Sequence, residues 1–377
     1  MTDDTLNRGP LGEARRIVVK IGSALLVEES TGRVHAAWLD TLAEDLAAWH
    51  RAGREIIVVS SGAVAVGRRR LGLTARRLRL EEKQAAAATG QIQLAHAYQN
   101  ALARFEIGVA QILLSLTDTE ERRRHLNARS TLETLLGLGV IPVINENDTI
   151  ATDEIRFGDN DRLAARVAQM ISADTLILLS DIDGLYTADP RRDATARRLE
   201  EVSEITAEIE AMAGDAPAGY SAGGMVTKLI AAKIAMQAGC RMAITDGKPP
   251  HALARLASGA AATWFRPRAT PTRARKQWIG GVLQTEGRLV VDEGAEQALG
   301  HGSSLLPAGI LAIEGEFERG DVVVIVNRAG RIIGRGLSAY NAGDARRIMG
   351  HKSREIEELL GYRGREEVIH RDDLVMQ

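Results

Sequence analysis

The chain has 377 residues, of which 45% are hydrophobic, 26% are charged and only 3% are aromatic. This length and composition predict two or three globular domains whose cores are built mainly from aliphatic side chains. The formal net charge of -2 argues against a protein whose overall field draws it to nucleic acid or to an anionic membrane.

The amino terminus and the cysteine content bear on location. The first residues contain no apolar signal core, and no run of about 18 apolar residues predicts a membrane helix. The single cysteine, Cys240, excludes an intrachain disulfide, and we interpret it as a small buried apolar residue. We therefore expect a cytoplasmic protein in a reducing compartment.

Short aliphatic segments alternate with longer helical segments through the first two thirds of the chain. The aliphatic segments end in small or polar residues, and they predict strands buried on both faces at 17–21, 55–60, 109–115, 140–145, 175–180 and 241–245. Helical spacing predicts helices at 36–51, 81–105, 118–138, 161–171 and 225–238. The alternation indicates an α/β fold, an open three-layer sandwich with a mostly parallel sheet. Ligands of such sheets bind beyond the carboxyl ends of the strands.

The pattern changes near Trp264. The segment 266–284 is rich in Pro and Arg and is typical of a linker. Shorter strand-like runs at 288–291, 309–313, 322–326 and 331–336, separated by turn residues, predict a small β-rich domain. The expected organisation is therefore a first domain over 1–265, a linker over 266–284, a second domain over 285–365 and a tail over 366–377.

Two predicted strands end in residues suited to phosphate. Lys20 stands in an apolar strand, where an unpaired ammonium group is costly, but at the strand's carboxyl end it could meet phosphate oxygens. Gly22 would let the backbone approach the same phosphate. A partly exposed lysine with a structural partner is the alternative. The second strand ends in Ser60-Ser61-Gly62 and opens a helix, a weak signal that many such turns share.

The segment 221–228 places two glycines before a helix, with Lys228 on its first turn. This arrangement could form a phosphate cradle, and the alternative is an ordinary capped helix with a surface lysine. The pattern GxxxxGK[ST] is absent, so the chain is not a P-loop enzyme.

Polar residues suited to a zwitterionic ligand follow the fourth strand. They are Asn145, Asp148, Asp159, Asn160 and Asp161. A carboxylate can pair with an α-ammonium group, and an asparagine amide can bind an α-carboxylate. The alternatives are a turn residue for Asp148 and a helix cap for Asp159 or Asp161. Ser180 and Asp181 end the fifth strand and could help to hold a nucleoside.

The motifs VVKIGSALL, VVSSGAVAVG, PVINENDTI, FGDND, LLSDIDGLYTADPR and SAGGMVTK, in this order, resemble those of the amino-acid kinase family. VDEGAEQAL, GSSLLPAGI and HKSREIEELLGY resemble the PUA domain that many members append. The resemblance is strongest to members that phosphorylate glutamate. It implies conversion of ATP and L-glutamate to L-glutamyl 5-phosphate, which is the first step of proline biosynthesis. It also implies dependence on Mg²⁺, inhibition by proline, a homo-oligomer (dimer or tetramer) and an association with glutamyl-phosphate reductase.

The same resemblance implies roles for individual residues. ATP would be held by Lys20, Ser180, Asp181, Ala222, Gly223, Gly224, Met225, Val226, Thr227 and Lys228. Glutamate would be held by Ser61, Asp148 and Asn160, with Asn145 and Asp159 nearby. Lys20 and Lys228 would stabilise the transferring phosphoryl group, Asp161 and Asp181 would orient these lysines or the metal, and no dedicated metal-binding residues are expected. Ala222 stands where many members carry a hydroxyl residue, which removes one side-chain contact to the nucleotide.

Two alternatives stay open on the sequence. One is a kinase of another small acceptor on the same fold, such as aspartate, N-acetylglutamate, carbamate or a nucleotide. The other is an RNA-binding protein, because PUA domains resemble RNA-modification modules and the segment 68–79 holds six arginines. Against RNA binding, residues 286–365 carry 11 Lys and Arg against 12 Asp and Glu, and the arginine run lacks interleaved aromatics. A solvated face is the preferred interpretation of that run.

Overall fold

The computed structural model describes residues 11–28, 31–73, 78–150, 160–214, 224–281 and 285–376. The chain divides into two compact units, residues 1–271 and 272–377, and each is described by itself. Within the described ranges, no helix combines the length and the apolar character that crossing a membrane requires.

The first unit is built on an eight-stranded sheet with the order β3-β4-β2-β1-β5-β7-β8-β6. The neighbouring strands pair in parallel except β7 and β8, which are antiparallel. The strands are β1 (Arg16–Ile21), β2 (Glu55–Ser60), β3 (Val109–Leu114), β4 (Ile141–Glu146), β5 (Thr175–Ser180), β6 (Glu201–Val202), β7 (Arg241–Asp246) and β8 (Ala262–Phe265). The predicted mostly parallel sheet is confirmed.

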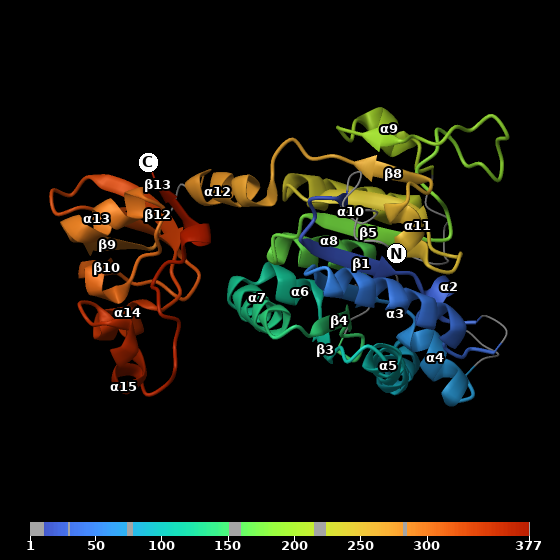
Figure 1. The fold of residues 1–377 in the computed structure, drawn as a ribbon, viewed down its shortest axis with the longest axis horizontal. Coiled ribbons are helices and arrows are strands. Elements are labelled where there is room, and N and C mark those ends of the chain that lie inside the picture. Colours follow the sequence, from blue (N-terminus) through green and yellow to red (C-terminus); the bar gives the residue numbers. More distant parts are fainter. Residues whose placement is uncertain are drawn as a thin grey trace. The chain divides into compact units, whose positions relative to one another are not determined.

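Helices cover both faces of this sheet, which makes three layers (Figure 1). One face packs against α2 (Ser23–Leu26), α3 (Ala36–Arg51), α4 (Ala63–Arg70), α5 (Leu80–Ala103) and α11 (Ala252–Ala257). The other packs against α6 (Leu116–Glu120), α7 (Arg122–Gly137), α8 (Asn160–Met170), α9 (Ala207–Ala211) and α10 (Met225–Gln237). Because successive side chains of a strand point to opposite faces, Val19 lies in the first core and Val18 in the second.

Burial explains where the predicted strands hold and where one differs. β1 lies at the centre of the sheet, and every residue from Ile17 to Ile21 is buried, so both faces need the apolar residues that the sequence supplies. β3 is an edge strand, and it is largely half-buried with Gln111 exposed. The prediction that 109–115 is buried on both faces was therefore wrong, because an edge strand has less of the sandwich around it.

One predicted helix is two helices in the structure. The segment 118–138 divides into α6 and α7 at Glu121, whose backbone is extended. The side chain of Ser115 caps α6 by accepting a hydrogen bond from the Asp118 backbone N–H, and the Asp118 carboxylate accepts one from the Ser115 backbone in return. This reciprocal capping box fixes a separate short first helix.

The second unit contains a five-stranded sheet with the order β10-β9-β11-β12-β13, which confirms the predicted small β-rich domain. Its strands are β9 (Gly287–Val291), β10 (Ile310–Gly315), β11 (Val322–Val326), β12 (Ile332–Leu337) and β13 (Leu374–Met376). Helices α13 (Glu293–Gly300), α14 (Ala342–Ile348) and α15 (Ile356–Leu360) contribute to its core. Helix α12 (Pro271–Gly281) lies in the segment interpreted as a linker, and β13 lies in the segment interpreted as a tail.

Candidate active site

Five strands that are adjacent in the sheet, in the order β4-β2-β1-β5-β7, end at one edge of it. Polar side chains stand at or just beyond their carboxyl ends: Asn145, Ser61, Lys20, Ser180 and Lys248. This is the edge at which open α/β sheets bind ligands. The order of the strands therefore sets the order of the functional groups across the site, with Lys20 in the middle.

Asp161, at the start of α8, holds two lysines of this edge. Its Oδ1 lies 2.6 Å from Nζ of Lys20, and its Oδ2 lies 3.2 Å from Nζ of Lys228. Asp161 is completely buried, and both lysines are less than a tenth exposed. Lys20 and Val18 are two residues apart in β1, so their side chains point to the same face of the sheet. Lys20 therefore faces the layer that contains α8 and α10. The cost of burying an ammonium group in β1 is offset by this carboxylate.

The two ammonium groups also decide the charge of Asp161. Burial alone raises the pKa of Asp161, but Lys20 and Lys228, with hydrogen bonds from Lys20 and Thr227, outweigh burial and lower that pKa below its ordinary value. Asp161 is therefore ionised at neutral pH. The cluster places two cations around one anion at the edge of the sheet where a ligand would bind.

The start of α10 contributes the second lysine and a set of backbone donors. The Thr227 hydroxyl lies 2.9 Å from Asp161 Oδ2 and 2.9 Å from the Gly224 carbonyl oxygen, which ties the first turn of α10 to α8. Gly224 is the N-cap and offers no side-chain cap, so the first-turn N–H groups of Met225 and Val226 are open to an anion. Ala222 and Gly223 lie outside the described residues.

Asn160, beside Asp161, joins the opposite part of the site. Its Nδ2 donates to the Ser60 carbonyl oxygen at 3.0 Å, to Ser61 Oγ at 2.8 Å and to Asn145 Oδ1 at 3.1 Å. These contacts bring together the ends of β2 and β4 at the start of α8. Asn160 Oδ1 is buried and accepts no hydrogen bond from any described residue. An unsatisfied buried carbonyl oxygen is costly, and it is an acceptor available to a ligand donor.

Asp148 follows β4 by two residues and is half-buried. Burial raises the pKa of Asp148 from its ordinary value to about 6. We call Ser61, Asn145, Asp148 and Asn160 the acceptor cluster. Asp159, the remaining residue predicted near it, lies outside the described residues.

Ser180 and Asp181 lie on the other side of Lys20. Ser180 Oγ donates to Asp181 Oδ1 at 3.3 Å, and Arg191 donates to Asp181 Oδ2 at 3.1 Å. Burial raises the pKa of Asp181, but hydrogen bonds to the carboxylate and the charge of Arg191 outweigh burial and lower it. The side chain of Asp181 is thus engaged by Ser180 and Arg191, whereas Asp161 contacts both Lys20 and Lys228.

Lys248 is a residue of this edge that sequence reasoning missed. It follows β7, and its Nζ donates to the Asp181 carbonyl oxygen at 2.8 Å, while the Gly247 N–H donates to the Ser180 carbonyl oxygen at 2.8 Å. The signal was present, because Asp246-Gly247-Lys248 follows a buried strand in the way that Gly22 and Ser61-Gly62 follow theirs. What the sequence lacked was the knowledge that β7 is the neighbour of β5.

Metal ligands are scarce around the site. Within the ranges that the structure describes, no three His, Cys, Asp or Glu side chains gather closely enough to hold a metal ion. Both Asp161 oxygens are already engaged by Lys20, Lys228 and Thr227. The arrangement can bind and orient anions, and it offers a zwitterion both donors and acceptors.

Known proteins resemble the chain over nearly its full length. Residues 15–246 match the model of the amino acid kinase family, and residues 287–360 match that of the PUA domain. A glutamate 5-kinase from Paramagnetospirillum magneticum is 65% identical over 368 residues, which are 98% of this chain and 99% of that protein. A glutamate 5-kinase from Rhodospirillum rubrum is 61% identical over 95% of this chain and 96% of its own length. A solved UMP kinase from Ureaplasma parvum superposes with a TM-score of 0.48 at 13% identity, over 67% of this chain and 99% of that one.

Proposed function

The chain belongs to the amino acid kinase family, and from its site and its relatives we propose that it transfers the γ-phosphoryl group of ATP to the γ-carboxylate of L-glutamate. This is the activity of the glutamate 5-kinases, two of which are 65% and 61% identical to it over nearly the whole chain. The product is L-glutamyl 5-phosphate, and the reaction is the first step of proline biosynthesis. Identity of this extent also sets aside the other acceptors that the fold alone would allow.

The single observation that carries the assignment of the site is the pair Asn160 and Asp161. Asn160 is bonded to Ser61 and Asn145 within the acceptor cluster, and Asp161 is bonded to both lysines. The start of α8 thus links the acceptor cluster to Lys20 and Lys228, the cations that would bind the transferring phosphoryl group. Transfer between two substrates requires this alignment, since holding the reactants in register supplies much of the rate.

ATP would lie over β1, β5 and β7. Its phosphates would meet Lys20, Lys228 and the open N–H groups of α10, while Ser180 and Asp181 would hold the nucleoside. The lysines stabilise the negative charge that spreads over the transferring phosphoryl group, and Asp161 keeps them at fixed positions. Backbone and lysine donors carry this binding, so the alanine at position 222 costs a single side-chain contact.

Glutamate would lie over β2 and β4. Its α-ammonium group would face the carboxylate of Asp148 and the unpartnered Oδ1 of Asn160, and Ser61 would bind its α-carboxylate with Asn145 and Asp159 nearby. The γ-carboxylate then points toward Lys20. It is ionised at neutral pH, since a glutamate carboxyl group has an ordinary pKa of about 4.3, so it attacks without a general base. The chain accordingly needs only to position it.

Mg²⁺ would arrive on the nucleotide. Both oxygens of Asp161 are engaged, and the described part of the chain holds no group of three potential metal ligands, which fits an ion held mainly by phosphate oxygens rather than by a protein cage. When bound, it supplies further neutralisation of the phosphate charge. The two substrates would be positioned by the side chains and backbone N–H groups named above.

The finer predictions form part of the same proposal. Proline would inhibit by entering the acceptor cluster, because it also carries an α-carboxylate and a charged amine. The proposal also includes a cytoplasmic homo-oligomer and an association with glutamyl-phosphate reductase. It keeps the domain bounds 1–265, 266–284, 285–365 and 366–377.

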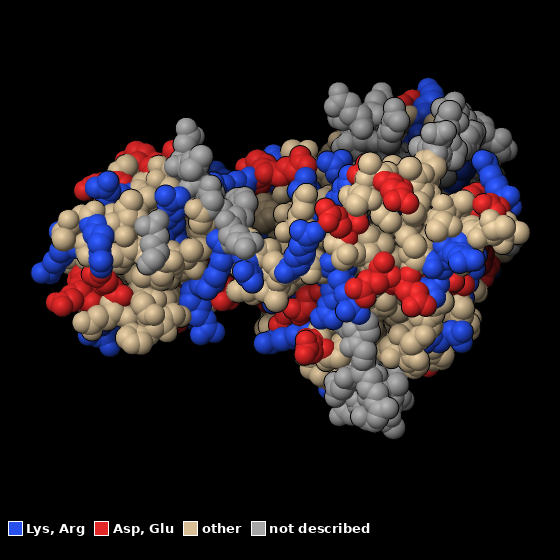
Figure 2. Space-filling model, turned by 90° about the horizontal axis from the view of Figure 1, so that it is seen from above, with Lys and Arg blue, Asp and Glu red and all other residues tan. Residues whose placement is uncertain are grey.

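No observation supports the alternative of RNA binding. Basic and acidic side chains are interspersed on the face drawn in Figure 2, and residues 286–365 are balanced in charge.

The reaction is tested by ADP release with ATP, Mg²⁺ and L-glutamate, with hydroxylamine present to trap the acyl phosphate. We expect hydroxamate that depends on glutamate and is suppressed by proline. Turnover with aspartate or carbamate but not with glutamate would keep the site and overturn the substrate. Absence of turnover with every acceptor would overturn the kinase assignment.

A further inference from the structure

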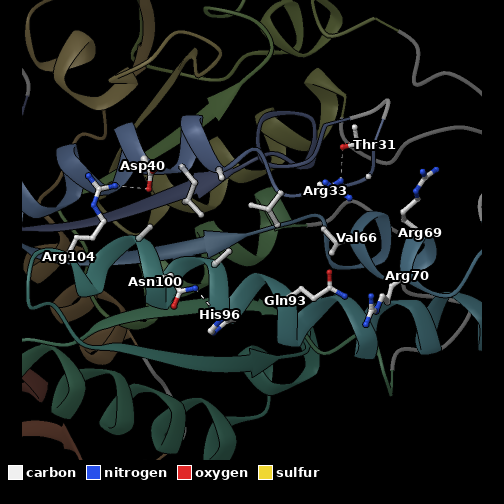
Figure 3. A pocket seen from close by; sticks show the side chains of 16 residues that line it. Thr31, Arg33, Asp40, Val66, Arg69, Arg70, Gln93, His96, Asn100 and Arg104 are labelled. Atoms are coloured by element: carbon white, nitrogen blue, oxygen red, sulfur yellow. Dashed lines mark hydrogen bonds and ion pairs between the residues drawn. The ribbon is translucent and has the colours of Figure 1, made fainter.

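A pocket of about 1000 Å³ opens on the first unit at a place that the proposed reaction does not use. It lies between α3, α4, α5 and the segment 31–34 (Figure 3). None of the site residues discussed above is among those that line it. Its size is that of a cavity for a small organic ligand.

The charge of this pocket is strongly unbalanced. Four arginines line it, Arg33, Arg69, Arg70 and Arg104, against one acidic residue, Asp40. Arg104 is bound to Asp40 at 2.9 Å and lies at one end of the pocket, while the other three lie toward the opposite end (Figure 3). No described carboxylate pairs with Arg33, Arg69 or Arg70. We call these three the open arginines.

The local fold places the segment that carries Arg33 against α4, the helix that carries Arg69 and Arg70. Val27 and Val34 form an antiparallel bridge, and just before Val34 the chain turns at Gly32, which lies in the left-handed region at φ 64°. A Cβ on Gly32 would lie 2.9 Å from Cβ of Arg69, so glycine is what lets this turn sit against α4. The turn thereby brings Arg33 to the arginines of α4.

The floor and the remaining walls of the pocket are mixed in character. Leu39, Val66 and Ala101 are buried beneath it, and Gln93, His96 and Asn100 of α5 add hydrogen-bonding groups. Arginine forks match phosphate oxygens in geometry, and a phosphate ester brings close to two negative charges on one group at neutral pH. We propose that the pocket binds a small phosphorylated metabolite, its phosphate on the open arginines and its organic part on the apolar floor.

The walls of the pocket continue into the acceptor cluster. Helix α4 begins directly after Ser61 and Gly62, and Tyr98 of α5 donates to Ser60 Oγ at 3.1 Å. The two helices touch without clearance, because a Cβ on Gly67 would lie 1.7 Å from the Ala86 carbonyl oxygen and one on Gly90 would lie 1.9 Å from that of Ala63. A ligand that shifts α4 must therefore shift the end of β2. Occupancy of the pocket changes glutamate binding, and this second half of the proposal rests on the proposed function.

Binding is tested on the full chain by calorimetric titration of inorganic pyrophosphate, with the nucleotide site filled by a non-hydrolysable ATP analogue and Mg²⁺. The test variant is R69A/R70A. The matched control is R123A/R328A, which removes two exposed arginines that have no carboxylate partner among the described residues and lie outside the pocket. We expect one pyrophosphate per chain in the wild type and the control, and binding at least tenfold weaker in R69A/R70A. Equal binding in all three proteins would overturn the site, as would equal loss in both variants.

Two further measurements test the third open arginine and the coupling of the pocket to glutamate binding. R33A changes the turn rather than a helix, and it should weaken pyrophosphate binding in the same way with an unchanged circular dichroism spectrum. In steady-state assays at saturating ATP, pyrophosphate should alter the KM for glutamate at least twofold in the wild type and not in R69A/R70A. An unchanged KM would overturn the coupling. The binding titration needs no turnover, so failure of the kinase assignment and failure of the pocket are separate outcomes.

Discussion

Asn160 and Asp161 stand side by side at the start of α8, and their side chains bind opposite halves of the site. Asn160 joins Ser61 and Asn145, whereas Asp161 joins Lys20 and Lys228. Adjacent residues in the first helical turn point in different directions, about 100° apart around the axis. The start of α8 lies beyond the end of β1, so its first two residues can contact side chains on both sides of that strand.

Removal of the Asp161 carboxylate is expected to damage both stability and activity. D161N removes the carboxylate that Lys20 and Lys228 share, and breaking such a buried pair costs about 3–5 kcal/mol. Urea unfolding would measure the loss in free energy of unfolding, and turnover should fall at least 100-fold. A folded D161N protein with wild-type turnover would refute the orienting role.

The two lysines of α10 form a matched pair for testing charge stabilisation. Lys228 is buried against Asp161, whereas Lys233, on the same helix, is ion-paired with Glu210 and partly exposed. K228A should lower kcat by about 100- to 1,000-fold, or about 2.7–4 kcal/mol, which is the effect of losing one preorganised donor. K233A should leave kcat within about twofold, because an exposed pair contributes little. Similar losses in both variants would point to damage of the helix instead.

The raised pKa of Asp148 predicts how glutamate binding depends on pH. The carboxylate that would pair with the α-ammonium group titrates at about 6. Because kcat/KM reports ionisations of the free enzyme, kcat/KM for glutamate should fall as pH drops below about 6. The D148N variant should have a low kcat/KM that is flat between pH 5 and 8. A wild-type profile that stays level down to pH 5 would contradict this role of Asp148.

The raised pKa of Asp148 also affects the stability of the fold. Binding of glutamate should weaken as pH falls, whereas the contribution of Asp148 to stability should weaken as pH rises. A carboxyl group whose folded pKa is raised favours folding when it is protonated, so its relative contribution is largest below the ordinary value of 3.8 and is lost as pH rises through about 6. Above pH 6 the folded protein therefore carries a buried charge that a ligand can partner. D148N should raise the midpoint of thermal unfolding at pH 7.5 and change it little at pH 4.

How far the sequence predicts this molecule depends on the kind of information required. Lys20 and Lys228 could be selected because a lysine in a buried strand, or after two glycines at a helix start, needs an anion. Lys248 was missed, and the sequence did not show that Asp161, rather than Asp181, contacts both lysines, because both facts depend on which strands are neighbours. Local patterns do not contain strand order.

The arginine run shows a second limit. The sequence predicts that the arginines of 68–79 form one solvated face, but in the structure the described arginines of this segment have different surroundings. Arg68 donates to the Leu73 carbonyl oxygen, Arg79 pairs with Glu81 and Glu82, and Arg69 and Arg70 line a pocket. Sequence patterns predict that a charge is exposed, but they do not predict that a turn distant in sequence, here the one at Gly32, will bring another charge beside it.

The contact of α4 with α5 gives the last prediction, which concerns stability. At Gly67 an added Cβ would lie 1.7 Å from the Ala86 carbonyl oxygen, whereas at Gly137, the last residue of α7, it would meet nothing within 4 Å. G67A must push two packed helices apart, and overpacking of this kind costs about 1–3 kcal/mol. G137A should instead stabilise by about 0.4–1 kcal/mol, since alanine restricts the unfolded chain more than glycine does. Urea unfolding of both variants measures the difference. Because α4 begins at the acceptor cluster, G67A should also raise the KM for glutamate more than that for ATP, and equal effects of the two substitutions would show that the close helix contact is unimportant.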